Sequence, residues 1–361
     1  MAKKDQLVLG IDLGGTKILT SVVNPQGEML SRNHTLTPAA KGPEGVIQAI
    51  LESSERALEG ASIGMDRISA VGVGAPGLAD TEAGILYTSP NLPGWEDVPL
   101  RGIVQEKLKK RTFLINDANA AALGEYYFGA AKGISHFIYV TISTGIGGGI
   151  VADGRLLNGS RGLAGEIGHM TIADKGPLCH CGNRGCWEAL ASGTALAKEA
   201  QKRIETGAET AILGFAKGRI DKVTAQTVQA AAEKGDPLAN ELILKTAYYF
   251  GVGLASLVNI FNPEMIVIGG GLSNMGDRLL KPAYQEAGER AFDRSFRMVR
   301  FVRAALGRNS GVLGAAAFAL DEVRRTSVNL KRKRPESGRS SHSTLKKPKG
   351  REGNLHGKRR S

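Results

Sequence analysis

The stretch LVLGIDLGGTKILTSVV, residues 7–23, predicts the fold of this chain. Its two ends, LVLGID (7–12) and ILTSVV (18–23), are rich in leucine and β-branched residues, and only the glycine turn LGGTK separates them. We therefore expect a β-hairpin that opens an α/β domain. The turn joins two strands instead of opening a helix, so its spacing fits neither the P-loop nor the Rossmann dinucleotide pattern.

The same turn is a candidate phosphate site. Gly14 and Gly15 let the backbone approach a phosphate closely, while Thr16 offers a hydroxyl and Lys17 a positive charge. Asp12, directly before the turn, can hold a water molecule bound to Mg²⁺. Taken alone, DLGGTK could equally be a plain hairpin turn.

Strands and helices alternate in the segment that follows. NPQG (24–27) is a turn, and the apolar patterns after it predict strands over 28–36, 67–74 and 112–115 and helices over 45–58 and 116–131.

A similar pattern begins about 130 residues after the first. The strand HFIYVTIS (136–143) leads into the glycine turn of STGIGGG (143–149), and a strand, IVAD (150–153), follows. A helix over 237–259, a strand over 264–269, the glycine turn of GGGLSN (269–274) and a closing helix after Asn309 complete it.

The repeat predicts two similar α/β lobes whose three glycine turns meet at a cleft. Exposed N–H groups at such strand ends suit an anion. Four glycines in STGIGGG are more than a turn needs, which favours phosphate binding over plain turn geometry. The expected nucleotide contacts in the second and third turns are Thr144, Gly145, Gly147, Gly270 and Gly271.

Composition sets broader limits. The chain has 361 residues, 42% apolar residues and 48 glycines, which suits a sizeable α/β core. We expect no membrane span and no signal peptide, and clustered thiols suggest a reducing, cytoplasmic compartment.

The net charge of +12 is concentrated in residues 326–361, where twelve Lys/Arg against two Asp/Glu give +10. This basic tail should be disordered. It is either a plain solvated extension, which we favour, or a nucleic-acid tether.

Asp117 is the candidate catalytic base. It lies in IND, where a strand leads into a helix, so it or Asn116 could be a simple N-cap. Beside phosphate-binding turns, however, its carboxylate can accept the proton of a substrate hydroxyl as a phosphoryl group arrives. Both roles are compatible.

All three cysteines lie close together. With a nearby histidine they form the pattern H-x9-C-x-C-x4-C, namely His169, Cys179, Cys181 and Cys186. Three thiolates and one imidazole complete a tetrahedral shell, so the pattern predicts structural Zn²⁺. Buried free thiols are the simpler alternative. His180 is a rival ligand, but alternation along the chain should turn its side chain away.

Two glutamates flank this cluster and suit a sugar. Glu166 precedes His169 and Glu188 follows Cys186, where a nucleic-acid site would need basic residues. Carboxylates accept hydrogen bonds from neighbouring hydroxyl pairs, so zinc would orient both without joining the reaction. Asn91 in NLPGW is a further hydroxyl partner or a plain loop residue, and Trp95 is expected to pack. We also expect this cluster to lie apart from the ATP turns.

The sequence resembles the ROK family (repressor, open reading frame, kinase), and most of all its bacterial ATP-dependent glucokinases. The matching motifs are LGIDLGGTK, NLPGW, NDANAA, STGIGGGIVADGRLLNGSRGLAGEIGH, CHCGNRGCWE and VIGGGLS, in family order over residues 7 to about 320. The resemblance implies a two-lobed, actin-like (ribonuclease-H-like) ATPase fold, Asp117 as the base and zinc on His169 and the cysteines. It also implies sugar contacts from Asn91, Asn116, Asp117, Glu166, His169 and Glu188.

We accordingly expect an N-terminal lobe (1–118) completed by a helix at about 309–324. A larger lobe (119–308) would hold the zinc knuckle and a dimer surface, with the tail at 326–361. The expected activity is ATP- and Mg²⁺-dependent phosphorylation of the glucose 6-hydroxyl by a homodimer or tetramer. The alternatives are a kinase for N-acetylmannosamine or fructose, or a sugar-sensing DNA-binding regulator that uses the tail.

Overall fold

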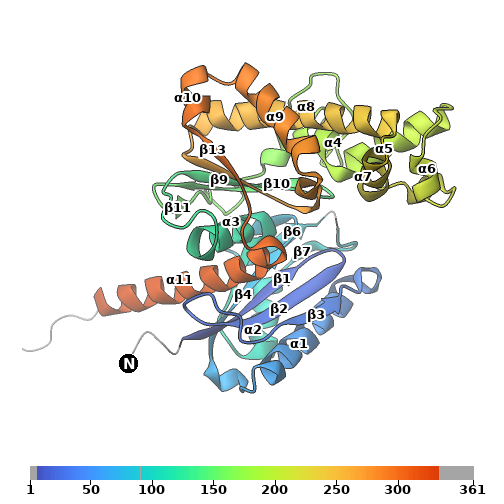
Figure 1. Cartoon of the computed structure of the whole chain (residues 1–361). Coiled ribbons are helices and arrows are strands. Elements are labelled where there is room, and N and C mark those ends of the chain that lie inside the picture. The colour runs from blue at the N-terminus through green and yellow to red at the C-terminus, as the bar shows by residue number, and fades with distance from the viewer. Residues whose placement is uncertain (1–5, 90, 333–361) are drawn as a thin grey trace, which may run out of the picture. The chain divides into compact units, whose positions relative to one another are not determined.

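Two five-stranded sheets with the same strand pattern organise the chain, as the computed structural model shows (Figure 1). The structure describes residues 6–89 and 91–332, and it separates residues 1–324 from a second unit, 325–361. The first sheet has the order β3-β2-β1-β4-β8, with β1 Leu7–Leu13, β2 Lys17–Val23, β3 Asn33–Leu36, β4 Ile68–Ala75 and β8 Thr112–Asn116. The second has the order β11-β10-β9-β12-β13, with β9 Phe137–Ile142, β10 Ile146–Ala152, β11 Arg155–Leu156, β12 Met265–Gly269 and β13 Arg300–Arg303.

Strand directions repeat as well. In each sheet the first strand pairs antiparallel with the second and parallel with the fourth, so the predicted pair of similar α/β lobes is confirmed. A small third sheet was not predicted, and it contains β5 Leu78–Asp80, β6 Ile85–Thr88 and β7 Glu96–Val98. The helices are α1 Gly42–Gly60, α2 Leu100–Leu108, α3 Asp117–Phe128, α4 Trp187–Ala191, α5 Gly193–Glu205, α6 Ile212–Phe215, α7 Ala225–Glu233, α8 Pro237–Phe261, α9 Asp277–Arg290, α10 Asp293–Met298 and α11 Ser310–Arg332.

Alternation along β1 decides what each of its faces contacts. Leu9 and Ile11 belong to the core that α1 covers, whereas Val8 packs with residues of α11 on the other face. Gly10 shares the α11 face, and a Cβ there would lie 2.4 Å from the carbonyl oxygen of Val312. Glycine is therefore required for α11 to pack this closely on the sheet.

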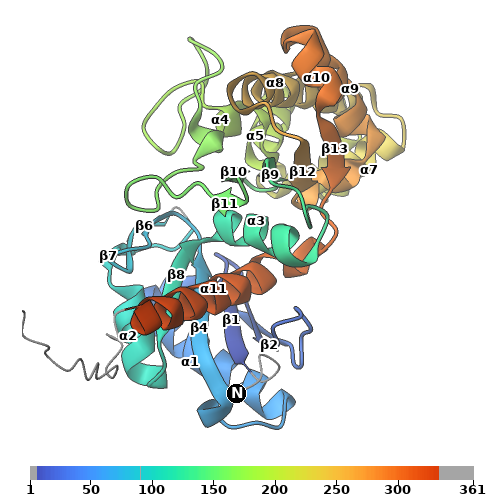
Figure 2. The same ribbon diagram turned by 90° about the vertical axis from the view of Figure 1, so that its left-hand side faces the viewer.

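Helices α3 and α11 lie between the two sheets (Figures 1 and 2). They cross at two glycines, because a Cβ on Gly124 would lie 2.3 Å from the Ser310 carbonyl and one on Gly314 would lie 1.6 Å from the Ala120 carbonyl. The buried Glu125 carboxylate adds to this crossing by accepting hydrogen bonds from Ser310 Oγ and from the N–H of Leu306. These contacts fix the two elements that connect the lobes.

Three of the four glycines of STGIGGG lie outside the predicted turn. Gly147 and the two residues after it lie in strand β10, not in the turn. A Cβ on Gly147 would meet Ala118 at 3.1 Å, and one on Gly149 would meet Ala122 at 2.5 Å. The close packing of β10 on α3 is therefore a reason for the excess glycines besides phosphate binding.

Other predicted bounds also need correction. The third strand covers only Asn33–Leu36 of the predicted 28–36. Met29 makes an isolated bridge with Val23, and the ladder is then interrupted where the N–H of Val22 donates to the side chain of Ser31 instead of a carbonyl. The closing helix α11 continues to Arg332, into the segment expected to be disordered, and the rest of that tail lies outside the described residues.

One helix is long and apolar enough to meet the length and composition of a membrane span. It is α8, and 56% of its most apolar window is buried within the structure. Its Phe250 and Leu254 are buried in the core of the second lobe, and Trp187 stacks on Phe250 at 5.3 Å between ring centroids. The apolar composition of α8 is therefore accounted for by its position as the central helix of this lobe.

Candidate functional site

The N-terminus of α3 carries the candidate base. Asn116 is the N-cap, since its Oδ1 accepts hydrogen bonds from the N–H of Ala118 (2.9 Å) and of Asn119 (3.1 Å). Its Nδ2 donates to the carbonyl of Gly77 at 3.1 Å. Asp117 is the first helical residue, and its Oδ1 accepts a hydrogen bond of 2.8 Å from the N–H of Ala118. The capping role thus belongs to Asn116, and the Asp117 carboxylate remains the candidate base at the start of the helix.

A second carboxylate shares the environment of Asp117. Asp12 ends the α11 face of β1, and its carboxylate lies so close to Gly311 that a Cβ there would be 2.6 Å from Oδ2. Desolvation, followed by the charge of Asp117, raises the pKa of Asp12 to about 7. Desolvation also raises the pKa of Asp117 to about 6, against the opposing effect of the N–H donors. Among the described residues no Lys or Arg forms an ion pair with either carboxylate.

The first glycine turn lies against the predicted sugar residue Asn91. The N–H of Gly14 donates to the carbonyl of Lys17 at 2.9 Å and closes the turn between β1 and β2. A Cβ on Gly15 would lie 2.6 Å from the Cβ of Asn91. Lys17 is exposed, and the carbonyl of Thr16 is engaged by the N–H of Thr37. Trp95 is buried, as the packing interpretation predicted.

The second and third turns lie side by side. The N–H of Ser143 donates to the carbonyl of Gly145 at 2.8 Å, and the N–H of Thr194, in α5, donates to the carbonyl of Thr144 at 3.2 Å. Gly270 has a φ of +87°, and a Cβ there would lie 2.3 Å from the Ile142 carbonyl at the end of β9. Gly271 follows at the start of a short 3-10 helix, Gly271–Met275.

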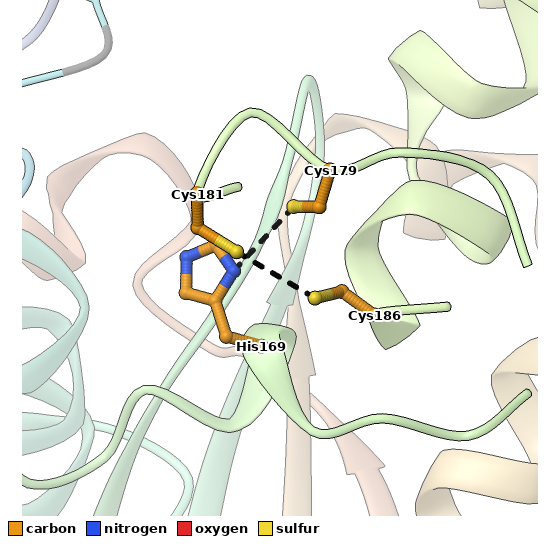
Figure 3. A group of neighbouring side chains, drawn as sticks. All are labelled: His169, Cys179, Cys181 and Cys186. Atoms are coloured by element: carbon orange, nitrogen blue, oxygen red, sulfur yellow. Dashed lines mark hydrogen bonds between the residues drawn. The ribbon is translucent and has the colours of Figure 1, made fainter. Parts of the chain in front are cut away.

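The three cysteines and His169 form one cluster, and Figure 3 shows their sulfur and nitrogen atoms turned toward one another. Their ligand atoms all lie within 4.8 Å of one another. His169 Nδ1 is 3.7 Å from Cys179 Sγ, and the sulfur atoms of Cys181 and Cys186 are also 3.7 Å apart. Three sulfur atoms and one imidazole nitrogen are a donor set that fits tetrahedral Zn²⁺.

His180 is not one of these four residues, but it has not turned away as predicted, and with His169 and Glu188 it forms a second group whose ligand atoms lie within 4.8 Å of one another. Its Nδ1 is 3.1 Å from Glu188 Oε1 and 3.9 Å from Cys179 Sγ. The pairing with Glu188 was not predicted, and the short separation of the two residues in CHCGNRGCWE was the only sequence signal for it.

The two flanking glutamates are anchored differently. Glu166 Oε2 lies 4.0 Å from His169 Nε2. This is the ring nitrogen that does not face the thiols, since Nδ1 lies near Cys179 Sγ. Desolvation and the charges of Asp117 and Glu188 raise the pKa of Glu166 to about 7, which places these three carboxylates in one electrostatic environment.

Glu188 connects the cysteine cluster to the second glycine turn. Its Oε2 accepts a hydrogen bond of 2.8 Å from the N–H of Ile146, and a Cβ on Gly145 would lie 2.2 Å from the same oxygen. The expectation that the cysteine-rich segment lies apart from the glycine turns was therefore wrong, because Glu188 contacts the second of them. Chain folding brings α4 against the start of β10, which local spacing does not reveal.

Comparisons with known proteins match this arrangement over most of the chain. The sequence model of the ROK family matches residues 8–322. A glucokinase of Streptomyces coelicolor is 39% identical over 87% of this chain and 97% of its own. A xylose repressor of Caldicellulosiruptor bescii is 34% identical over 88% and 78%. The crystal structure of a ROK family glucokinase from Streptomyces griseus, in complex with glucose and AMPPNP, is 37% identical with a TM-score of 0.76, over 87% of this chain and 99% of that one.

Proposed function

This chain belongs to the ROK family, and from that premise we propose that it is an ATP-dependent glucokinase, which transfers the γ-phosphoryl group of ATP to the 6-hydroxyl of glucose. The observation that carries the proposal is the desolvated carboxylate of Asp117 at the start of α3, in one electrostatic environment with Asp12 and Glu166. The crystal structure of the Streptomyces griseus relative contains both glucose and AMPPNP, and its kinase name supports the same reaction here.

Asp117 acts as the general base. Its carboxylate accepts the proton of the sugar hydroxyl as the hydroxyl oxygen attacks the phosphoryl group, and phosphoryl transfer needs positioning more than a strong base. A pKa of about 6 keeps Asp117 largely ionised at neutral pH while leaving it basic enough to take the proton.

The sugar is held by six side chains in this proposal: Asn91, Asn116, Asp117, Glu166, His169 and Glu188. Glu166 and Glu188 accept hydrogen bonds from sugar hydroxyls. Their position beside the cysteine cluster supports this role, because both are anchored by residues of one loop system. The Nε2 atom of His169 faces away from the thiols toward Glu166, so it is placed to contact a hydroxyl.

ATP contacts the three glycine turns, through Gly14, Gly15, Thr16 and Lys17 in the first, Thr144, Gly145 and Gly147 in the second, and Gly270 and Gly271 in the third. Gly147 lies within β10, so its support is weaker than that of Thr144 and Gly145. Mg²⁺ accompanies ATP and neutralises phosphate charge. The site fits a cation, since Asp12 and Asp117 are two desolvated carboxylates without an ion-pair partner in the described residues.

Structural zinc is bound by His169, Cys179, Cys181 and Cys186. The donor set of three sulfurs and one nitrogen supports zinc and leaves no coordination position open for catalysis. When bound, zinc would hold the loops of Glu166 and Glu188 in place.

Four further expectations remain proposals. The repeated strand order supports an actin-like ATPase fold. The boundaries of the lobes and a cytoplasmic location are predictions from sequence alone. A homodimer through the second lobe is supported by exposed apolar side chains on α8 and around α10, among them Leu244, Ile260, Phe292 and Met298.

A coupled assay tests the function directly. The purified protein with ATP and Mg²⁺ should produce ADP with glucose, and a panel of mannose, fructose, N-acetylglucosamine and N-acetylmannosamine would show which hexose is preferred. Failure to turn over any hexose contradicts the kinase. The xylose repressor similarity keeps the regulator as the alternative, and DNA binding at physiological salt that is lost on removing residues 333–361 would favour it.

A further inference from the structure

Asn119 lies one helical turn after Asn116, on the same side of α3, and it faces the loop that leads to Glu166. Its side chain is 2% exposed. Nδ2 donates a hydrogen bond of 3.3 Å to the carbonyl of Ala164, two residues before Glu166. Helix α3 thus carries the candidate base and also binds the loop of a sugar-binding carboxylate.

Two glycines surround the amide of Asn119. A Cβ on Gly149 would lie 3.1 Å from Oδ1, and a Cβ on Gly165 would lie 3.2 Å from the same atom. Gly165 has a φ of +96°, which side chains rarely adopt. The loop therefore passes over Asn119 in a conformation that depends on glycine and allows little space for any other arrangement.

The oxygen of this amide has no hydrogen-bond donor among the described residues. A buried acceptor without a partner does not stabilise the fold, so packing alone gives no reason for an amide here. The Nδ2 bond to the loop is the interaction that distinguishes asparagine from an apolar residue of similar size.

The far side of the same loop is held by the first lobe. The N–H of Thr81 donates to the carbonyl of Arg161 at 3.3 Å, and the Arg161 guanidinium lies 3.8 Å from the buried Asp80 carboxylate. Asn119 is the contact that ties the Glu166 end of the loop to α3.

We propose that Asn119 is a positioning residue of the glucose site, which holds the loop before Glu166 in register with Asp117 so that sugar binding and the base are aligned. The inference rests on the proposed glucokinase function. Asn119 acts through Glu166, not on the substrate.

Asn119→Ala tests the proposal. It removes the loop bond together with an oxygen that has no partner, so the glucose KM should rise about tenfold or more while the ATP KM changes less than about twofold. Thr246→Ala is the matched control, because Thr246 is also a buried helical polar residue, bonded to the Leu242 carbonyl at 2.9 Å, but it lies in α8. The control should leave both KM values unchanged. Equal rises in both KM values for Asn119→Ala would overturn the proposal.

A double-mutant cycle gives the sharper result. If Asn119 acts through Glu166, then Asn119→Ala combined with Glu166→Gln should bind glucose as weakly as Glu166→Gln alone. Independent, additive losses would contradict the mechanism.

Hydrogen exchange separates this inference from the kinase proposal. In Asn119→Ala, amides of residues 160–168 should exchange faster while those of α3 keep their protection. Unchanged exchange in that loop overturns the positioning role. Absence of glucose phosphorylation by the unmodified protein would instead overturn the proposed function, and the exchange result would still decide the role of Asn119.

Discussion

Glu188 Oε2 accepts a hydrogen bond of 2.8 Å from the backbone N–H of Ile146. One residue of the cysteine-rich segment is therefore bonded directly to the second glycine turn. His180 holds the other oxygen of the same carboxylate at 3.1 Å. Glu188 consequently links the proposed zinc site and the proposed sugar site to the second glycine turn, and damage to any one of them should reach the others.

Opening the cysteine cluster should therefore affect both substrates. Cys181→Ala removes one of the proposed zinc ligands and loosens the loops of Glu166 and Glu188. Glucose affinity should fall most, and the ATP KM should also rise, by about two- to fivefold, because Glu188 supports the turn at Ile146. Elemental analysis should find one zinc per chain in the unmodified protein and less in the variant. A metal-free Cys181→Ala protein with an unchanged glucose KM would exclude an organising role for the cluster.

Asp117→Asn should preserve the fold and sugar binding while turnover falls about a hundredfold or more, because the amide cannot accept the hydroxyl proton. The substitution keeps the side-chain size, and the Oδ1 that receives the N–H of Ala118 has an amide counterpart. Steady-state kinetics measures the turnover number, and thermal unfolding checks that the variant is folded. Near-normal turnover in the folded variant would remove Asp117 from the mechanism.

Activity should depend on pH through the same residue. Burial raises the pKa of Asp117 to about 6, so the ionised form that acts as base is lost as the pH falls through this value. kcat/KM for glucose should be level only well above pH 7, begin to fall near pH 7 as Asp12 and Glu166 take up protons, and fall more steeply below pH 6 as Asp117 does. A profile that stays flat down to pH 5 would show that no group of this pKa is required in its basic form.

Helix α11 should tolerate no side chain at the glycines beneath it. A Cβ on Gly72 would lie 1.9 Å from the carbonyl oxygen of Ala315, so Gly72→Ala should destabilise the protein by about 2 kcal/mol or more in the free energy of unfolding. Gly102→Ala is the control, because Gly102 lies within α2 with nothing within 4 Å of the added Cβ. The free energy of unfolding of that variant should rise by roughly 0.5–1 kcal/mol. Chemical denaturation measures the free energy of unfolding of the two variants. Equal values would contradict the conclusion that α11 packs too closely on Gly72 to allow a side chain.

The sequence alone determined the features that depend on local spacing. The hairpin of residues 7–23 and the repeated strand pattern follow from β-branched runs around glycines, and Leu9 and Ile11 alternate with Gly10 as a strand requires. The cluster of His169 with the cysteines was predicted because its members lie close together in a glycine-rich segment, where few conformations can separate them.

Only the tertiary structure decided which residues meet across the chain. Gly147 and Gly149 were predicted in a phosphate turn, but they lie in β10 because α3 packs directly on them. The contact of Glu188 with Ile146 and that of Asn119 with Ala164 join residues more than forty positions apart. Hydrophobic periodicity specifies which face of an element is buried, but not which element covers it, and packing between elements therefore fixed the arrangement of the site.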